Sequence, residues 1–348
     1  MNQTTLTQKT HQVSRGFTYT YYRSRIPTTT TTTNNLNHPK ILLLHGWPDT
    51  SNLWKNLIKN HLHPKNYEIL SLACLGYGKT SKPKDEKHYS FELITKDIQE
   101  ILEQEKISKV IPIGHDFGSM IAQRFYNFFP NYVLALCLVN VAYRPPSSPL
   151  QSQSFNLDNV IKYSEEKLCY GCFHYWKLQI DPNGPSIYNH HLESAFDAIY
   201  ANPESWRYKT FCQPDGLKNF LLHDLHYSYH DRDVFATEDM KREFLDRMSR
   251  DGFDAPLAYY RAIVHHVHSH GNVELYHRGN SLVVNVPTLF VGYTQDYACP
   301  PVGIKQPSDQ GFLPHLSTAI FTGGHWGLLA KPEEFGRAVV NWLDGVFR

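Results

Sequence analysis

Residues 113–120 read IGHDFGSM, and an apolar segment, KVIPIG (109–114), leads into them. Gly114 and Gly118 have the spacing of a nucleophile elbow, G-x-S-x-G, in which the central residue lies on a sharp turn between a strand and a helix. The central residue here is Asp116 rather than a serine. The following segment, IAQRFYNFF (121–129), fits the helix of such a motif. The stretch therefore predicts a strand, a tight turn and a helix, with a carboxylate exposed at the turn.

The composition is typical of a globular protein with a large core, because 41% of the 348 residues are hydrophobic and 19% are charged. The formal net charge is only +1, so we expect neither nucleic acid nor an anionic membrane as a partner. Apolar stretches such as VLALCLV (133–139) are far shorter than the roughly 20 residues of a membrane span. The N-terminus does not resemble a secretory signal, and the six cysteines do not suggest a disulfide framework. These features predict a cytoplasmic location.

Short apolar runs bounded by turn residues predict the strands of a buried sheet. They lie at 40–46, 67–73, 109–114, 133–140, 285–293 and 317–323, and the alternating segment FTYTYYRS (17–24) predicts a further strand. Helical periodicity predicts a helix over 91–105, and Pro332 is a favoured first residue for the last helix. Strands that alternate with helices indicate an α/β fold with a parallel sheet.

The alternation stops in the middle of the chain, where Tyr, His and Pro are frequent and only helices are suggested. An interruption of this length is far longer than an ordinary connection. We therefore predict an α/β core in two parts, residues 1–141 and 283–348, with a mainly helical cap, residues 142–282, inserted between them. The low-complexity run at 26–39 is predicted to be a loop.

Two further polar residues follow predicted strands of the second core segment. Asp296 follows the strand in VGYTQD, and His325 follows the last strand in FTGGHW. With Asp116 they give the chain order nucleophile, acid, histidine, which is the order of the triad in α/β-hydrolases. The carboxyl ends of parallel strands meet at one edge of the sheet, so the three side chains are expected to lie together. The sequence thus predicts a catalytic triad on an α/β-hydrolase core.

A carboxylate at the elbow suits a particular reaction. Asp116 is ionised near neutral pH and can attack without a base, and displacement at a saturated carbon would leave an alkyl ester on it. His325, oriented by Asp296, could then activate water to hydrolyse that ester. The oxyanion of this second step needs backbone donors, for which the elbow supplies the amide of Phe117. The loop HGWPD (45–49) supplies the amide of Trp47 as the second predicted donor.

Five segments together resemble the α/β-hydrolase-fold epoxide hydrolases: HGWPD, CLGYGKTS, GHDFGS, TQDYA and GGHW. The similarity extends from about Lys40 to the C-terminus, without much of the insertion. It implies a helical cap in which two tyrosines bind the epoxide oxygen and stabilise the developing alkoxide. FHYWKLQ (173–179) resembles the first of these segments, which gives Tyr175, and AYYRA (258–262) resembles the second, which gives Tyr260. Tyr170 and Tyr259 are the neighbouring alternatives.

The resemblance leaves a rival enzyme class open, because haloalkane dehalogenases also use an aspartate at the elbow. Many of these enzymes bind the halide through a Trp that follows the nucleophile, and this chain has Phe117 there. Some relatives place the triad acid one strand earlier, where this chain has Asn140, an amide. Both departures favour Asp296 as the acid and an epoxide as the substrate. A non-catalytic protein that binds small molecules on the same fold is a further alternative.

The sequence therefore predicts hydrolysis of an apolar epoxide to a vicinal diol, with water as the second reactant. The predicted reaction needs neither a cofactor nor a metal ion. A homodimer is left open.

Overall fold

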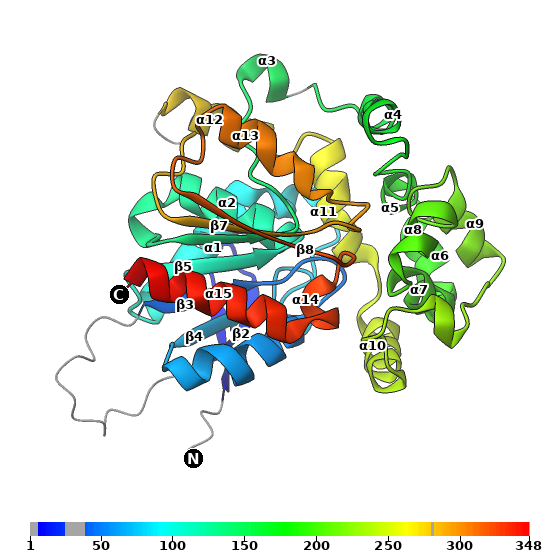
Figure 1. Ribbon diagram of the computed structural model, residues 1–348, viewed down its shortest axis with the longest axis horizontal. Coiled ribbons are helices and arrows are strands. Elements are labelled where there is room, and N and C mark those ends of the chain that lie inside the picture. Colours follow the sequence, from blue (N-terminus) through cyan, green and yellow to red (C-terminus); the bar gives the residue numbers. More distant parts are fainter. Residues whose placement is uncertain (1–5, 25–38, 153, 280–281, 348) are drawn as a thin grey trace.

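The computed structural model describes residues 6–24, 39–152, 154–279 and 282–347. Its centre is an eight-stranded sheet with the order β1-β2-β4-β3-β5-β6-β7-β8 (Figure 1). The strands are β1 (Thr7–Gln12), β2 (Thr18–Arg23), β3 (Lys40–Leu44), β4 (Ile69–Leu72), β5 (Val110–His115), β6 (Leu136–Val139), β7 (Thr288–Tyr293) and β8 (Leu316–Phe321). From β4 to β8 all neighbouring strands pair in parallel, whereas β2 pairs antiparallel with both β1 and β4. The predicted α/β fold is confirmed.

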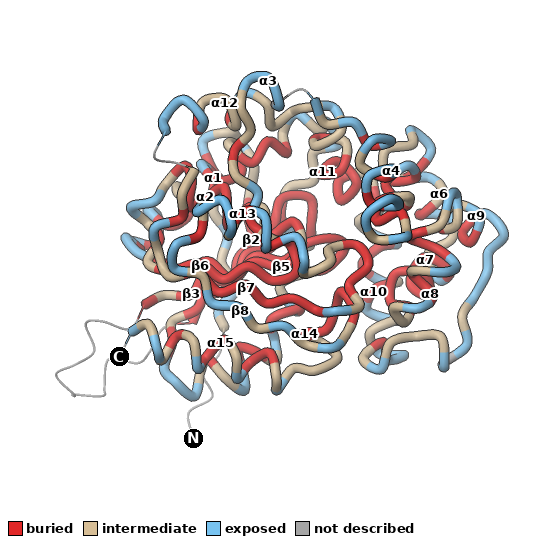
Figure 2. Tube along the Cα trace, turned by 45° about the horizontal axis from the view of Figure 1, so that its top comes forward, coloured by how far each residue is buried: buried red, intermediate tan, exposed pale blue. Residues whose placement is uncertain are grey.

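The central strands are buried because helices cover both faces of the sheet. Every residue of β4, β5, β6 and β7 is buried, and the buried trace is continuous through the middle of the molecule (Figure 2). Strands covered on both faces read as unbroken apolar runs rather than as alternating patterns. These runs are the signal from which the strands were predicted.

The helices are α1 (Phe91–Gln104), α2 (Phe117–Phe128), α3 (Pro149–Ser152), α4 (Leu157–Leu168), α5 (Trp176–Ile180), α6 (Gly184–His190), α7 (Leu192–Ile199), α8 (Pro203–Tyr208), α9 (Gly216–Leu222), α10 (Glu238–Asp251), α11 (Asp254–Val264), α12 (Ser269–His277), α13 (Lys305–Asp309), α14 (Gly327–Ala330) and α15 (Pro332–Phe347). Short 3-10 segments lie at η1 (Ser51–Trp54), η3 (His63–Lys65), η4 (Glu86–Tyr89), η5 (Pro130–Tyr132), η6 (Tyr229–Asp231) and η7 (Pro301–Ile304), and a π-helical segment at η2 (Leu57–Leu62). The pair α1 and α2 covers one face of the sheet and α15, with η2, the other (Figure 1).

The edge strand β1 was not predicted from the sequence. Its residues, TQKTHQ, are polar, and none of its side chains is fully buried. It forms because a turn at Gly16 folds it back onto β2, with which it pairs along its whole length. An exposed edge strand held by backbone hydrogen bonds leaves no hydrophobic pattern to detect.

Between β6 and β7, the part of the chain that the structure describes forms the ten helices α3 to α12. Helices α4 to α10 lie together on one side of the core, beyond α11 (Figure 1). The boundaries at 141/142 and 282/283 stay a prediction, as does the loop at 26–39, which lies almost entirely outside the described residues. Within the described ranges, no helix has the length and apolar character needed to cross a membrane.

Candidate active site

Asp116 lies where β5 ends and α2 begins, with φ 55° and ψ −124°. This left-handed backbone is rare for a residue with a side chain, and it turns the carboxylate away from the helix. The turn is tight because two glycines, Gly114 and Gly118, let the backbones approach closely. A Cβ on Gly118 would lie 2.0 Å from the Leu44 carbonyl oxygen, and one on Gly114 would lie 2.1 Å from that of Gly118. The predicted strand, turn and helix are present.

The loop after β3 brings backbone donors to this carboxylate. The Trp47 amide donates to Asp116 Oδ1 at 2.9 Å. A Cβ on Gly46 would lie 2.4 Å from the same oxygen, so only glycine allows this approach. The loop is fixed by His45, whose Nε2 accepts the Cys74 amide at 3.1 Å, and it includes a cis peptide bond at Trp47–Pro48. The amide of Phe117 also interacts with the carboxylate. Both predicted oxyanion donors therefore face the group that would carry the ester.

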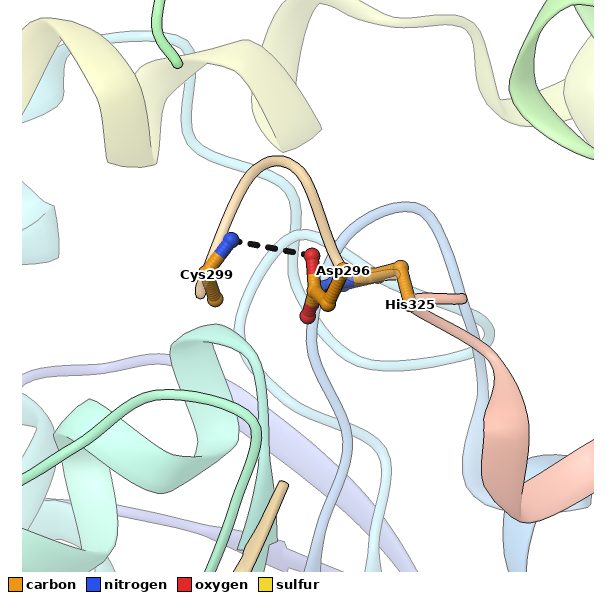
Figure 3. Close-up of side chains that lie close together, drawn as sticks. All are labelled: Asp296, Cys299 and His325. Carbon is orange, nitrogen blue, oxygen red and sulfur yellow. Dashed lines mark hydrogen bonds and ion pairs between the residues drawn. The ribbon is translucent and has the colours of Figure 1, made fainter. Parts of the chain in front are cut away.

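His325 and Asp296 complete a buried row of side chains. His325 Nδ1 lies 2.8 Å from Asp296 Oδ2, and His325 Nε2 lies 3.7 Å from Asp116 Oδ2. Asp296 Oδ1 accepts the amides of Ala298 and Cys299 at 3.1 and 2.9 Å, and Figure 3 shows the Cys299 amide beside it. The imidazole is thus held in the orientation that leaves Nε2 toward Asp116. The structure brings together the three residues predicted as a triad.

The pKa values of the row follow from burial and from the charges within it. Burial raises the pKa of Asp116, and His325 and the backbone amides oppose that rise. Burial would also raise the pKa of Asp296, but its contact with His325 and the hydrogen bonds it accepts lower it overall. Burial disfavours the imidazolium of His325, yet nearby carboxylates raise its pKa to about 9. These carboxylates are Asp296, Asp116 and Asp49, in order of effect.

Two polar residues that sequence reasoning did not place in the site lie directly behind it. Asn140, which also has a positive φ of 69°, donates through Nδ2 to Asp296 Oδ2 and to the carbonyl oxygen of His325, the latter at 3.0 Å. Asp49 is buried and accepts the indole N–H of Trp326 at 2.8 Å. Burial raises the pKa of Asp49 to about 7. From the sequence, Asn140 could only be excluded as the acid of the triad. Its contacts could not be predicted, because they depend on how β6 packs beside β7.

The two predicted tyrosines lie on the cap side of Asp116. Tyr260 is 2% exposed, and its ring lies edge-on to Phe117 at 4.8 Å and to Trp47 at 5.8 Å between ring centroids. The Tyr175 and Tyr260 rings are 6.0 Å apart. The negative charge of Asp116 raises the pKa of each phenol, in addition to the larger effect of burial. Both hydroxyls therefore stay protonated and available as donors.

The alternative tyrosines have other contacts. The Tyr259 hydroxyl donates to the Leu75 carbonyl oxygen at 3.0 Å. The Tyr170 ring packs edge-on against Tyr297 at 5.2 Å and beside the Arg207 guanidinium. These contacts engage Tyr259 and Tyr170 elsewhere, which favours Tyr260 and Tyr175 over their neighbours as the predicted pair.

Two groups of side chains in the described ranges could hold a metal ion, because their ligand atoms lie within 4.8 Å of one another. The first is Asp296, Cys299 and His325, which Figure 3 draws. A metal there would occupy the atoms through which Asp296 orients His325. The second, Glu92, His270 and Glu274, lies between α1 and α12.

The chain belongs to the alpha/beta hydrolase fold family, which it matches over residues 39–332. It is 24% identical to bifunctional epoxide hydrolase 2 of Sus scrofa over 310 residues, 88% of this chain and 51% of that protein. The chain therefore spans about half the length of this relative and of the similar Mus musculus protein. It is also 23% identical to epoxide hydrolase srdG of Neurospora crassa over 88% of this chain and 87% of that one.

Among solved structures, epoxide hydrolase A of Mycobacterium thermoresistibile superposes with a TM-score of 0.75 at 18% identity. The match covers 98% of this chain and 99% of that one. At this identity the likeness establishes a shared fold.

We predict that stability depends on pH through His325. Its pKa is about 9 in the folded protein, against an ordinary value of 6.5. A pKa raised by folding stabilises the folded state fully below the unfolded value, and this stabilisation is lost as the pH rises through the folded value. The loss of unfolding free energy caused by His325→Gln should thus be largest below pH 6.5 and shrink up to about pH 9.

Denaturant unfolding of both proteins across this pH range measures the difference. His277→Gln removes an exposed histidine from α12 and serves as the control. A difference for His325→Gln that stays constant with pH would contradict the assignment of a raised pKa.

Proposed function

We propose that this protein is an epoxide hydrolase that converts an apolar epoxide to a vicinal diol through an alkyl ester on Asp116. One observation carries the proposal: the elbow presents a carboxylate that faces the His325–Asp296 pair at 3.7 Å and lies near two buried phenols. The names of the relatives support the same reaction.

The first step is attack on the epoxide. Asp116 Oδ1 is occupied by the Trp47 amide, so Oδ2 is the freer oxygen and the one that attacks. A bond forms between Oδ2 and a ring carbon as the bond from that carbon to the epoxide oxygen breaks. The electron pair stays on the oxygen, which takes a proton from Tyr175 or Tyr260 and becomes a hydroxyl. A phenol suits this role because it is protonated at neutral pH and donates to an alkoxide.

The second step is hydrolysis of the ester. His325 Nε2 takes a proton from water, and the hydroxide adds to the carbonyl carbon of the Asp116 ester. The negative charge develops on Oδ1, where the amides of Trp47 and Phe117 stabilise it. The intermediate then collapses, the carbon–oxygen single bond of the ester breaks, and the leaving diol oxygen receives the proton back from His325. Asp116 is left as a carboxylic acid, and its proton returns to the tyrosinate formed in the first step, so that both residues regain their starting states.

The order of the steps follows from the charges. His325 has a raised pKa while Asp116 is an anion, and in that state it is a poor base. Ester formation removes the negative charge of Asp116 and with it one of the effects that raise the pKa of His325, after the larger effect of Asp296, while burial continues to disfavour the imidazolium. His325 is therefore more readily deprotonated, and so able to accept a proton from water, once the ester has formed.

The aromatic rings around the candidate site favour an apolar substrate. Trp47 and Tyr260 lie within 5.8 Å of each other, and the ring of Trp176 lies edge-on to Tyr260 at 5.1 Å. Tyr188 and Phe253 stack at 4.4 Å beside Trp47. Such rings offer a large apolar surface and few hydrogen-bonding atoms.

We predict that a His325→Gln variant accumulates the ester, because attack by Asp116 does not need a base and hydrolysis does. After incubation with aryl and alkyl epoxides, intact mass spectrometry should show a gain equal to one whole epoxide, and peptide mapping should place it on Asp116. The double variant Asp116→Ala, His325→Gln is the control and should gain no mass. Haloalkanes are tested in parallel.

A gain equal to a haloalkane less hydrogen halide, with none from any epoxide, would indicate dehalogenation instead. Reversible binding of an epoxide by the wild-type protein with neither adduct nor turnover would indicate a non-catalytic binding protein.

We predict that Tyr175→Phe and Tyr260→Phe each slow ester formation by about tenfold or more, and that the double variant is slower than either, since each phenol can assist the leaving oxygen. Rapid-quench mass spectrometry of adduct formation in the His325→Gln background measures this rate. Tyr259→Phe is the matched control, since its hydroxyl is bound to the Leu75 carbonyl oxygen. Equal rates for Tyr260→Phe and Tyr259→Phe would contradict the assignment.

A further inference from the structure

Two buried polar side chains in the cap lack hydrogen-bond partners. Both polar atoms of the Gln179 carboxamide and the hydroxyl of Tyr188 are buried and make no hydrogen bond of ordinary length and angle within the described part of the chain, although the two side chains lie close enough for a weak one with each other. Each residue is 0% exposed. An unpaired buried polar group costs free energy, and folded proteins rarely keep one without a reason.

The pair adjoins the candidate active site. The Gln179 amide N–H donates to the Tyr175 carbonyl oxygen at 3.3 Å, as in one turn of helix. Residues four apart on a helix share a face, so Gln179 lies on the same face of α5 as Tyr175. Tyr188, on α6, has its ring 6.2 Å from that of Trp47, edge-on. Trp47 is the residue whose amide binds Asp116.

Gln179 and Tyr188 are also neighbours of each other. Burial raises the pKa of Tyr188, and the Gln179 side chain opposes that rise. The Tyr188 hydroxyl in turn contributes to the raised pKa of Tyr260, although burial, Tyr175, Asp116 and Tyr77 have larger effects. The three polar atoms therefore form one small cluster, which we call the Gln179–Tyr188 pair, beside the phenol that faces the nucleophile.

The chemistry of the pair selects its ligand. A carboxamide carries N–H donors and an oxygen acceptor, and a phenol hydroxyl can both donate and accept a hydrogen bond. A group that itself donates and accepts, such as a hydroxyl or a carboxamide, would satisfy the pair. A carboxylate would be repelled by the Asp116 anion, and any ion would lose its hydration without gaining an opposite charge from the pair.

We propose that the substrate is an epoxide whose apolar body carries one neutral hydrogen-bonding group, a hydroxyl or a carboxamide, and that Gln179 and Tyr188 bind this group. The inference rests on the proposed epoxide hydrolysis and narrows its substrate class.

The test compares linear alkyl epoxides with the same compounds carrying a terminal hydroxyl or carboxamide, over several chain lengths. For at least one chain length, wild-type kcat/KM should be higher for the polar compound by about tenfold or more, because a site built to bind a hydroxyl rejects the analogue that lacks it. Gln179→Leu and Tyr188→Phe should each remove most of this preference. The readout is the ratio of the two kcat/KM values measured on the same variant, so a change in overall activity does not affect it.

Stability gives an independent readout. Gln179→Leu removes unpaired polar atoms at nearly constant volume, so its Tm should equal or exceed that of the wild type. Gln123→Leu is the matched control, because Gln123 is also buried but is bonded to Val141, Ala142 and the Arg144 amide. It should lower the Tm and leave the substrate preference unchanged.

Equal wild-type kcat/KM for plain and polar epoxides at every chain length would overturn the inference and leave epoxide hydrolysis standing. An unchanged preference in both Gln179→Leu and Tyr188→Phe would do the same. Absence of turnover of every epoxide by the wild type would overturn the proposed function and the inference together.

Discussion

The candidate site depends on the close approach of three backbone segments around Asp116. The end of β3, the loop at Gly46 and the first turn of α2 meet where Cβ atoms on Gly46, Gly114 or Gly118 would lie between 2.0 and 2.4 Å from their neighbours. This crowding holds Asp116 at a positive φ and aims its carboxylate at the ends of the parallel strands. Backbone strain at a single residue persists only when its surroundings fix it, and here the sheet does so.

The charged side chains of the site also depend on one another. Asp296 is held by Asn140 and by two backbone amides, and it fixes His325 at 2.8 Å. Because Asp116 is itself one of the charges that raise the pKa of His325, after Asp296, the state of the nucleophile affects how readily the histidine is deprotonated. In the proposed mechanism this coupling makes the histidine effective only after the ester has formed. The oxygen that binds the Trp47 amide in the free protein is also the oxygen that would carry the negative charge during hydrolysis.

Much of this could be predicted from the sequence because the signals are local. Buried parallel strands appear as apolar runs, and Asp116, Asp296 and His325 each follow one, so the sheet topology brings them together. The polar edge strand β1 left no such signal. The contacts of Asn140 could not be predicted, because they arise from the pairing of β6 with β7, strands separated by a long insertion. Tyr175 and Tyr260 were suggested only by family resemblance. The unpaired state of Gln179 depends on how α5 and α6 pack, which periodicity does not determine.

In the proposed mechanism Asp116 becomes esterified, and water attacks the ester rather than the epoxide. A single turnover with excess enzyme in water labelled with heavy oxygen (¹⁸O) tests it most directly. The mechanism predicts that the first diol carries no label and that the Asp116 carboxylate gains it, as mass spectrometry of the diol and of the Asp116 peptide would show. A labelled diol from the first turnover, with Asp116 unlabelled, would mean that water attacks the epoxide directly, and it would contradict the role assigned to Asp116.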